Sequence, residues 1–333
     1  MDNYHNYLQL KQEVLNKLFS NVNNIIPATN IRHYRNNSTL SLGQSGTIDQ
    51  SCTINTSIIV SIINKWIDKH SSLNRKVWHN VKIRDIDNLI MIKLELKISN
   101  HDELTKWHSE KVNLLIYLLN KCQDINLQSI YYQINNELSL LTGQPYLIFR
   151  YNDNINLTIM TDNFVQINTE MMYQIYNQID ALSNSLTINN FISIGDDSGN
   201  ICTIFHSKYK YLYGIIHSEQ SYQSALNNNH LNQIANISYI HDPKLWSTLS
   251  DYDHINNLLV INPGRKGLGN KGIGVVNNLI NINNIIYMSC KIKTLRDDLS
   301  KLTKWRLITI SPIDNFPFID NYCENIVLLQ KTI

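Results

Sequence analysis

Cys290 is a candidate nucleophile because of the residues around it. It follows an apolar segment, Ile285–Met288, that predicts a strand, and it precedes the basic residues Lys291, Lys293 and Arg296. Nearby cations lower the pKa of a thiol and favour the reactive thiolate. A single cysteine is more often a small buried hydrophobic residue, so this interpretation depends on the flanking residues.

A glycine-rich loop follows another apolar segment, Leu258–Ile261, and could bind a ligand. Five of the eleven glycines fall between Gly264 and Gly274. The GxxxxGK[ST] pattern of nucleoside-triphosphate-binding loops is excluded, because neither Gly269 nor Gly272 precedes a lysine. Open α/β sheets bind ligands at the carboxyl ends of their strands, so a ligand-binding loop and a plain connection both remain open.

The elements that would position these residues predict an α/β fold. After Gln166, strand-like segments alternate with helix-like ones, which is typical of a parallel sheet with crossover helices. The last two strands are joined by a loop too short for a crossover helix, so they should pair antiparallel. The predicted strands are Phe191–Ile194, Tyr211–Ile215, Ile237–Ile240, Leu258–Ile261, Ile285–Met288, Trp305–Ser311 and Asn325–Leu329.

The preceding residues predict a different arrangement. Apolar residues recur at helical spacing from Tyr4 to Ile26, and residues 31–165 mix strand patterns with an amphipathic helix at Glu103–Leu119. We therefore expect three parts, namely an N-terminal amphipathic helix within 1–30, a smaller α+β central domain at 31–165, and the α/β domain at 166–333.

Composition narrows the function classes. The formal net charge of +2 gives no signal for or against nucleic acid. The five cysteines form no CxxC pair and the eleven histidines no metal-binding motif, so we expect no metal site. Without a secretory leader or an apolar run of about 18 residues, the sequence predicts a soluble, cytoplasmic or nuclear protein that is not secreted and not in a membrane.

The segment around Cys290 resembles a block of the RNA uracil-5 methyltransferase family. Residues 287–299 are similar to the family pattern YxSCNPxTLxxDL, whose cysteine is the nucleophile. Cys290, Thr294 and Asp298 fall on matching positions, whereas Lys291 and Ile292 stand in place of the Asn-Pro pair.

Three further segments resemble the same family. Residues 313–329 are similar to DxFPxTxHxExxxLL, and one inserted residue aligns Glu324 with the general base, with Tyr322 in place of the histidine. Residues 262–268 resemble DPPRxGL, which aligns Asn262 with the acid and Arg265 with the arginine. Residues 163–168 resemble SFxQVN, whose glutamine, here Gln166, contacts S-adenosylmethionine.

The resemblance keeps the family's order over residues 31–333. It implies a Rossmann-like class I methyltransferase domain that ends in an antiparallel hairpin, without the family's N-terminal TRAM-type barrel. It also implies RNA, either tRNA or rRNA, as substrate and the central domain as an RNA-binding side. By this resemblance Gln166, Gly199, Asn200 and Asn262 would contact S-adenosylmethionine; Phe164 and Arg265 would contact the RNA.

The implied reaction is methylation of uracil C5 through a covalent adduct. The thiolate of Cys290 would add to C6, C5 would take the methyl group, and Glu324 would remove the C5 proton before Cys290 leaves. C5 of uracil is a poor nucleophile until such an adduct forms, so the reaction needs both residues.

The cofactor loop departs from the family pattern. Gly195 replaces an aromatic residue, Asp197 replaces the first motif glycine, and Ile216 stands where a carboxylate would hold the ribose. Loss of one charged hydrogen bond costs about 1.5 to 3 kcal/mol. Two hypotheses therefore remain, an RNA uracil-5 methyltransferase with an altered cofactor site, and a catalytically impaired relative that serves as an RNA-binding or scaffold protein.

Overall fold

The computed structural model describes residues 2–42, 49–195, 198–254 and 257–332, and the chain forms two compact units. The first unit comprises Met1–Ile31, Arg150–Leu157 and Glu170–Ile333, and the second comprises Arg32–Phe149 and Thr158–Thr169. The division falls inside a two-stranded sheet formed by β6 (Leu147–Arg150) and β7 (Asn156–Ile159).

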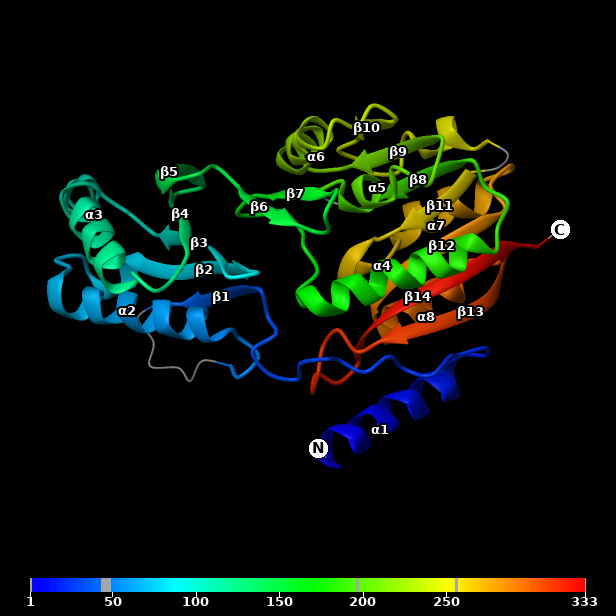
Figure 1. Ribbon diagram of the computed structural model, residues 1–333, viewed down its shortest axis with the longest axis horizontal. Helices are drawn as coiled ribbons and strands as arrows, with labels where there is room; N and C mark the ends of the chain where they lie inside the picture. Colours follow the sequence, from blue (N-terminus) through cyan, green and yellow to red (C-terminus); the bar gives the residue numbers. More distant parts are fainter. Residues whose placement is uncertain (1, 43–48, 196–197, 255–256, 333) are drawn as a thin grey trace. The chain divides into compact units, whose positions relative to one another are not determined.

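The first unit is built on a seven-stranded sheet with the order β10-β9-β8-β11-β12-β14-β13 (Figure 1). Its first five strands are parallel, and β14 pairs antiparallel with both β12 and β13. The predicted parallel sheet with a terminal antiparallel pair is confirmed. The strands are β8 (Asn190–Ile194), β9 (Tyr211–Ile216), β10 (Ile237–His241), β11 (Asn257–Ile261), β12 (Asn284–Lys291), β13 (Trp305–Ile313) and β14 (Tyr322–Lys331).

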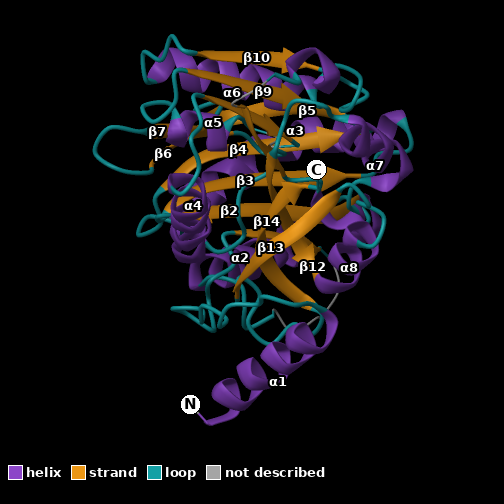
Figure 2. Ribbon diagram, turned by 90° about the vertical axis from the view of Figure 1, so that its right-hand side faces the viewer, coloured by secondary structure: helices purple, strands orange, loops and turns teal. Residues whose placement is uncertain are grey.

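Helices cover both faces of this sheet. Figures 1 and 2 together show α4 on one face and α7 and α8 on the other. Every residue of β11 is buried, because a parallel strand covered on both faces has no solvent side. The helices are α4 (Thr169–Asn184), α5 (Asn200–Phe205), α6 (Glu219–Leu231), α7 (Gly269–Asn278) and α8 (Ile292–Leu299), with short 3-10 helices η2 (Leu249–Tyr252) and η3 (Gly264–Lys266).

The N-terminal helix α1 (Asp2–Leu18) is shorter than the predicted helix, which ran to Ile26. Beyond it the chain is extended along the edge strand β13. The amide of Asn23 donates to the carbonyl of Ile310 at 2.9 Å, and that of Ile26 donates to the carbonyl of Pro312 at 2.9 Å. The backbone after Leu18 therefore pairs with the open edge of β13, and a helical spacing of apolar residues does not reveal this pairing.

The second unit contains a five-stranded sheet with the order β1-β2-β3-β4-β5. Helix α3 connects the parallel pair β3 and β4, and the other pairs are antiparallel. The predicted helix at Glu103–Leu119 is confirmed, but α2, which begins after the capping residue Thr53, was not among the predicted elements. The elements are β1 (Asn37–Ser41), α2 (Ile54–His70), η1 (Arg75–Val77), β2 (Trp78–Ile86), β3 (Leu89–Leu96), α3 (His101–Lys121), β4 (Leu127–Ile134) and β5 (Glu137–Gly143).

Within the four described stretches of the chain, no helix combines the length and the apolar character needed to cross a membrane. The same stretches contain no group of three or more side chains that could hold a metal ion.

Candidate active site

Cys290 and Glu324 lie on neighbouring strands, β12 and β14. In this strand pair Ser289 lies opposite Asn325, and Lys291 lies opposite Tyr322. The register shifts between these two pairs, so that two residues of β14 lie opposite the single residue Cys290. These two residues are Cys323 and Glu324. The side-chain amide of Asn325 fastens the strands here, donating to the carbonyls of Ser289 at 3.0 Å and Cys323 at 2.6 Å. The two predicted catalytic residues, 34 positions apart in the sequence, are thus brought together.

Burial controls the electrostatics of this pair. Glu324 is only 4% exposed, and desolvation raises the pKa of its carboxyl to about 8. The pKa of the half-buried Cys290 thiol is raised to about 12, first by desolvation and then by the charge of Glu324. Arg265 and Lys291 lower it by less. The expectation that basic neighbours would depress the thiol pKa is therefore wrong for the free protein, because desolvation outweighs them.

Arg265 reaches the same end of the sheet from η3, directly after β11. Its guanidinium carbon lies 5.7 Å from the centre of the Tyr322 ring, which is within cation–π distance. Tyr322 in turn packs against Phe316 at 5.6 Å between ring centres. The tyrosine that replaces the family's histidine therefore holds an arginine beside Cys290.

Cys323 is the obvious rival nucleophile, and its surroundings exclude that role. The residue is fully buried, and its thiol donates to the carbonyl of Ile313 at 3.2 Å. Burial raises the pKa of the Cys323 thiol far above its ordinary value. It is therefore a packing residue.

Asp298 joins two of the motif segments, a role that sequence comparison did not reveal. Its carboxylate accepts from the Tyr287 hydroxyl at 2.6 Å and from the Leu268 amide at 2.9 Å. Gly267 has a φ of +70°, and a Cβ there would lie 2.3 Å from Asp298 Oδ2. The buried carboxylate thus holds the glycine-rich loop against β12 and α8. An acidic residue on the otherwise apolar face of α8 is the sequence signal that could have indicated this structural role.

A buried ion pair connects α1 with the loop that precedes Glu324, and sequence analysis missed it. Lys11 Nζ lies 2.7 Å from Asp314 Oδ1 and donates to the Phe316 carbonyl at 3.2 Å. The Tyr4 hydroxyl donates to the other oxygen of Asp314 at 2.7 Å. Asp314 belongs to the matched tail motif, but nothing in the local sequence indicates a partner 303 residues away.

The predicted cofactor loop lies where the strand order reverses, between β8 and β11. Gly195 follows β8 with a φ of +83°, and the amide of Asn262 donates to the Ile194 carbonyl at 2.9 Å. A Cβ on Gly195 would lie 2.2 Å from the Asn262 carbonyl oxygen. The glycine that replaces the family's aromatic residue is therefore required by a left-handed backbone and by this close approach.

The other predicted cofactor residues differ in what they can offer. Gly199 has a φ of +70° and precedes α5, while Asn200 is 2% exposed, with its side-chain oxygen 3.4 Å from the amide nitrogen of Asn228. Ile216 is 1% exposed at the end of β9, so no carboxylate faces a ligand from this position. Asp197 lies outside the described residues.

Gln166 and Phe164 belong to the second unit. Gln166 is buried, and its carbonyl accepts from the side-chain amide of Asn36 at 2.8 Å. Phe164 is 39% exposed, beside Asn163, whose carbonyl accepts from the buried Arg84. The backbone of the segment that resembles SFxQVN is thus held by the side chains of Asn36, just before β1, and of Arg84 in β2, while Phe164 is partly open to solvent.

Comparison with known proteins agrees with this picture. Residues 246–332 match the model of the tRNA (uracil-5-)-methyltransferase family. The chain is 29% identical over 221 residues to an uncharacterized RNA methyltransferase of Enterococcus faecalis, and this match covers 63% of this chain and 46% of that protein. It is 24% identical to an uncharacterized RNA methyltransferase of Nanoarchaeum equitans (99% of this chain, 76% of that protein) and 24% identical to a putative RNA methyltransferase of a mimivirus (99% and 94%).

Among solved structures, the chain is similar to the Pyrococcus abyssi tRNA (uracil-54, C5)-methyltransferase in complex with S-adenosyl-L-homocysteine. The TM-score is 0.72 at 17% identity, over 98% of this chain and 83% of that one. This likeness establishes the fold, that of the Rossmann-like class I methyltransferases. The chain spans about half the length of the Enterococcus relative.

Proposed function

We propose that this protein methylates C5 of a uracil in RNA, because residues 246–332 match the model of the tRNA (uracil-5-)-methyltransferase family. The methyl donor would be S-adenosylmethionine, and tRNA is the first substrate class to test. The observation that carries the proposal is the juxtaposition of Cys290 and Glu324 across β12 and β14. A nucleophile and a base on adjacent strands are the two groups that this reaction needs.

The residues would act in sequence on one face of the base. The Cys290 thiol would release its proton to solvent as its sulfur bonds to C6, and the electrons of the C5–C6 double bond would move toward the C4 carbonyl. S-adenosylmethionine supplies the methyl group that C5 then takes up. The Glu324 carboxylate accepts the proton from C5, the double bond re-forms, and the C6–S bond breaks to release Cys290.

The charge states of Glu324 and Cys290 in the free site affect these reaction steps. With a pKa of about 8, Glu324 is mostly protonated at neutral pH, and it becomes a competent base as the pH rises through 8. Arg265 is the cation that favours the Cys290 thiolate, and its guanidinium is held over Tyr322.

The residues at the carboxyl ends of β8 and β11 fit a methyl donor in part. The strand order reverses there, and Gly195 allows the chain after β8 to pass close to the backbone of Asn262 after β11. Gly199 and Asn262 flank this turn, and Gln166 would add its amide by resemblance. Ile216 supplies no carboxylate for the ribose, which lowers the expected affinity by about tenfold to a hundredfold.

A second candidate function follows from the same departure from the family's cofactor-binding pattern. If the loss of the carboxylate at Ile216 and of the acid at Asn262 abolished donor binding, the protein would keep RNA binding without catalysis. The burial of Ile216 favours this alternative, because a buried apolar side chain offers the ribose no hydrogen-bond acceptor.

Trapping the covalent adduct tests the proposal directly. In the presence of S-adenosylmethionine, a 5-fluorouridine in the RNA can take up the methyl group but has no C5 proton for Glu324 to remove, so the adduct should persist and be retarded on a denaturing gel. We expect the adduct with the wild type and with the control Cys323→Ala, and none with Cys290→Ala. Absence of an adduct, together with no heat of binding for S-adenosylhomocysteine at millimolar concentration, would favour the non-catalytic alternative.

A further inference from the structure

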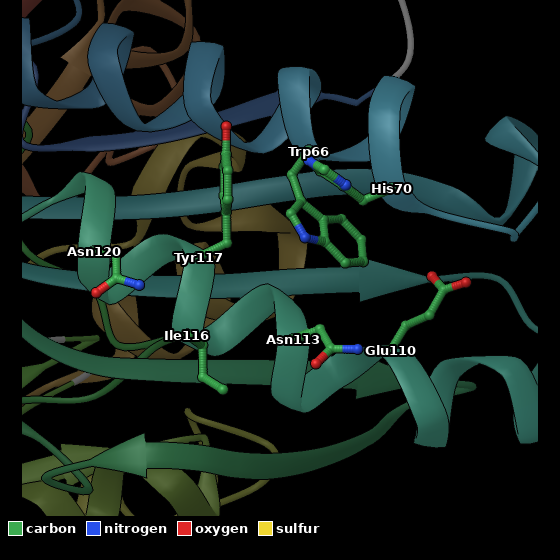
Figure 3. A pocket seen from close by; sticks show the side chains of 7 residues that line it. All are labelled: Trp66, His70, Glu110, Asn113, Ile116, Tyr117 and Asn120. Atoms are coloured by element: carbon green, nitrogen blue, oxygen red, sulfur yellow. The ribbon is translucent and has the colours of Figure 1, made fainter.

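A groove of about 380 Å³ lies between α2 and α3 of the second unit (Figure 3). Its volume falls in the lower part of the range of small-molecule sites, roughly 300 to 1,000 Å³. Residues of α2 form one wall and residues of α3 the other. The lining residues are Trp66, His70, Glu110, Asn113, Ile116, Tyr117 and Asn120.

Three aromatic rings line the groove. The Trp66 and His70 ring centres are 6.4 Å apart, and those of His70 and Tyr117 are 5.7 Å apart. Figure 3 shows the Tyr117 ring extending from α3 toward α2. Core packing accounts for Trp66, which is buried against Trp78, but His70 is exposed and Tyr117 is half-buried. The latter two rings can therefore stack on a ligand.

Polar groups on one face of α3 accompany these rings. Glu110, Asn113, Tyr117 and Asn120 are spaced by three or four residues, so they lie on a single face of the helix. Glu110 is buried and held in place, because one of its carboxylate oxygens accepts from the Ser72 amide at 2.6 Å. The exposed amides of Asn113 and Asn120 can each donate and accept.

A cation stands beside the rings. Lys121 Nζ lies 6.0 Å from the centre of the Tyr117 ring. An exposed lysine next to a stacking ring suits a phosphate, since an ammonium group binds phosphate as a point charge.

We propose that this groove binds one unpaired nucleotide of the RNA substrate. Its base stacks on Tyr117 and His70, its polar edge meets Asn113 and Asn120, and Lys121 contacts its phosphate. Sequence-tolerant stacking with an adjoining cation is the mode by which proteins bind single-stranded nucleotides. The inference rests on the proposed function for the identity of the ligand, but it concerns residues that take no part in methyl transfer.

Fluorescence anisotropy with a labelled, unmodified tRNA transcript tests this site. We expect Tyr117→Ala to weaken binding by about fivefold to a hundredfold, while Tyr117→Phe keeps the wild-type affinity. Lys121→Ala should reduce the slope of log affinity against log salt by about 1. His108→Ala, on an exposed part of α3 outside the groove, is the matched control.

A second variant guards against misfolding. Asn120 is exposed, so Asn120→Asp should leave the melting temperature unchanged and weaken tRNA binding by charge repulsion. If Tyr117→Ala and Asn120→Asp both bind tRNA within twofold of the wild type, the groove is no nucleotide site. Methyl transfer to tRNA by the wild type is measured in parallel. Transfer with unaffected binding overturns the groove alone, whereas groove-dependent binding without any transfer overturns the proposed function alone.

Discussion

The thiol of Cys290 should be unusually unreactive in the free protein, and Glu324 should be part of the reason. The pKa of the Cys290 thiol is raised from 9.0 to about 12, which lowers its thiolate fraction at pH 8 by roughly a thousandfold relative to an ordinary cysteine. Glu324→Gln removes the second contribution to this rise and leaves the burial in place. Because Glu324 ionises only around pH 8, its charge opposes the thiolate above that pH and not below it.

Alkylation by iodoacetamide, followed at Cys290 by peptide mass spectrometry, measures this effect without RNA or cofactor. We expect Glu324→Gln to react about three- to tenfold faster than the wild type at pH 9 and at the same rate at pH 6. The four other cysteines are buried and serve as internal references. A rate ratio that stays constant from pH 6 to pH 9, or a wild-type rate at pH 7 equal to that of glutathione, would refute this reasoning.

Three further predictions concern stability and cofactor binding. Since the folded pKa of Glu324 is raised, its ionisation costs stability as the pH rises from about 4.5 to 8, so Glu324→Gln should unfold at higher urea than the wild type at pH 9 but not at pH 4.5. Lys11→Met should lower the unfolding free energy by about 3 to 5 kcal/mol, because Asp314 is left buried without its cation; a loss under about 1 kcal/mol in urea titration would contradict a buried pair. Gly195→Ala should cost at least about 1 kcal/mol and abolish calorimetric binding of S-adenosylhomocysteine, whereas Gly274→Ala, where a Cβ meets open space, should keep it.

These predictions separate two kinds of residue in the site. Cys290 and Glu324 would carry out the chemistry, and burial destabilises the charged form of each side chain. Lys11, Asp314 and Asp298 hold the segments that present them, through a buried ion pair and buried hydrogen bonds. A loss of activity in Lys11→Met would therefore reflect a displaced loop, and it should be accompanied by the loss of stability described above.

The strands of the first unit could be predicted from the sequence, because continuous apolar segments between polar turns are a local signal. It also made Cys290, Glu324 and Arg265 candidate site residues, because each lies in a segment that resembles a motif of the uracil-5 methyltransferases. The short connection between the last two strands was enough to predict their antiparallel pairing, since a crossover helix would not fit.

The properties of these residues depend on contacts between segments that are distant in the sequence. The direction of the Cys290 pKa shift depends on desolvation and on a carboxylate from another strand, whereas the local sequence shows only the neighbouring cations. The end of α1 at Leu18 depends on the open edge of β13, and the pairing of Lys11 with Asp314 depends on contact between the two ends of the chain. Burial and long-range pairing arise when distant segments pack together, so no pattern within one segment contains them.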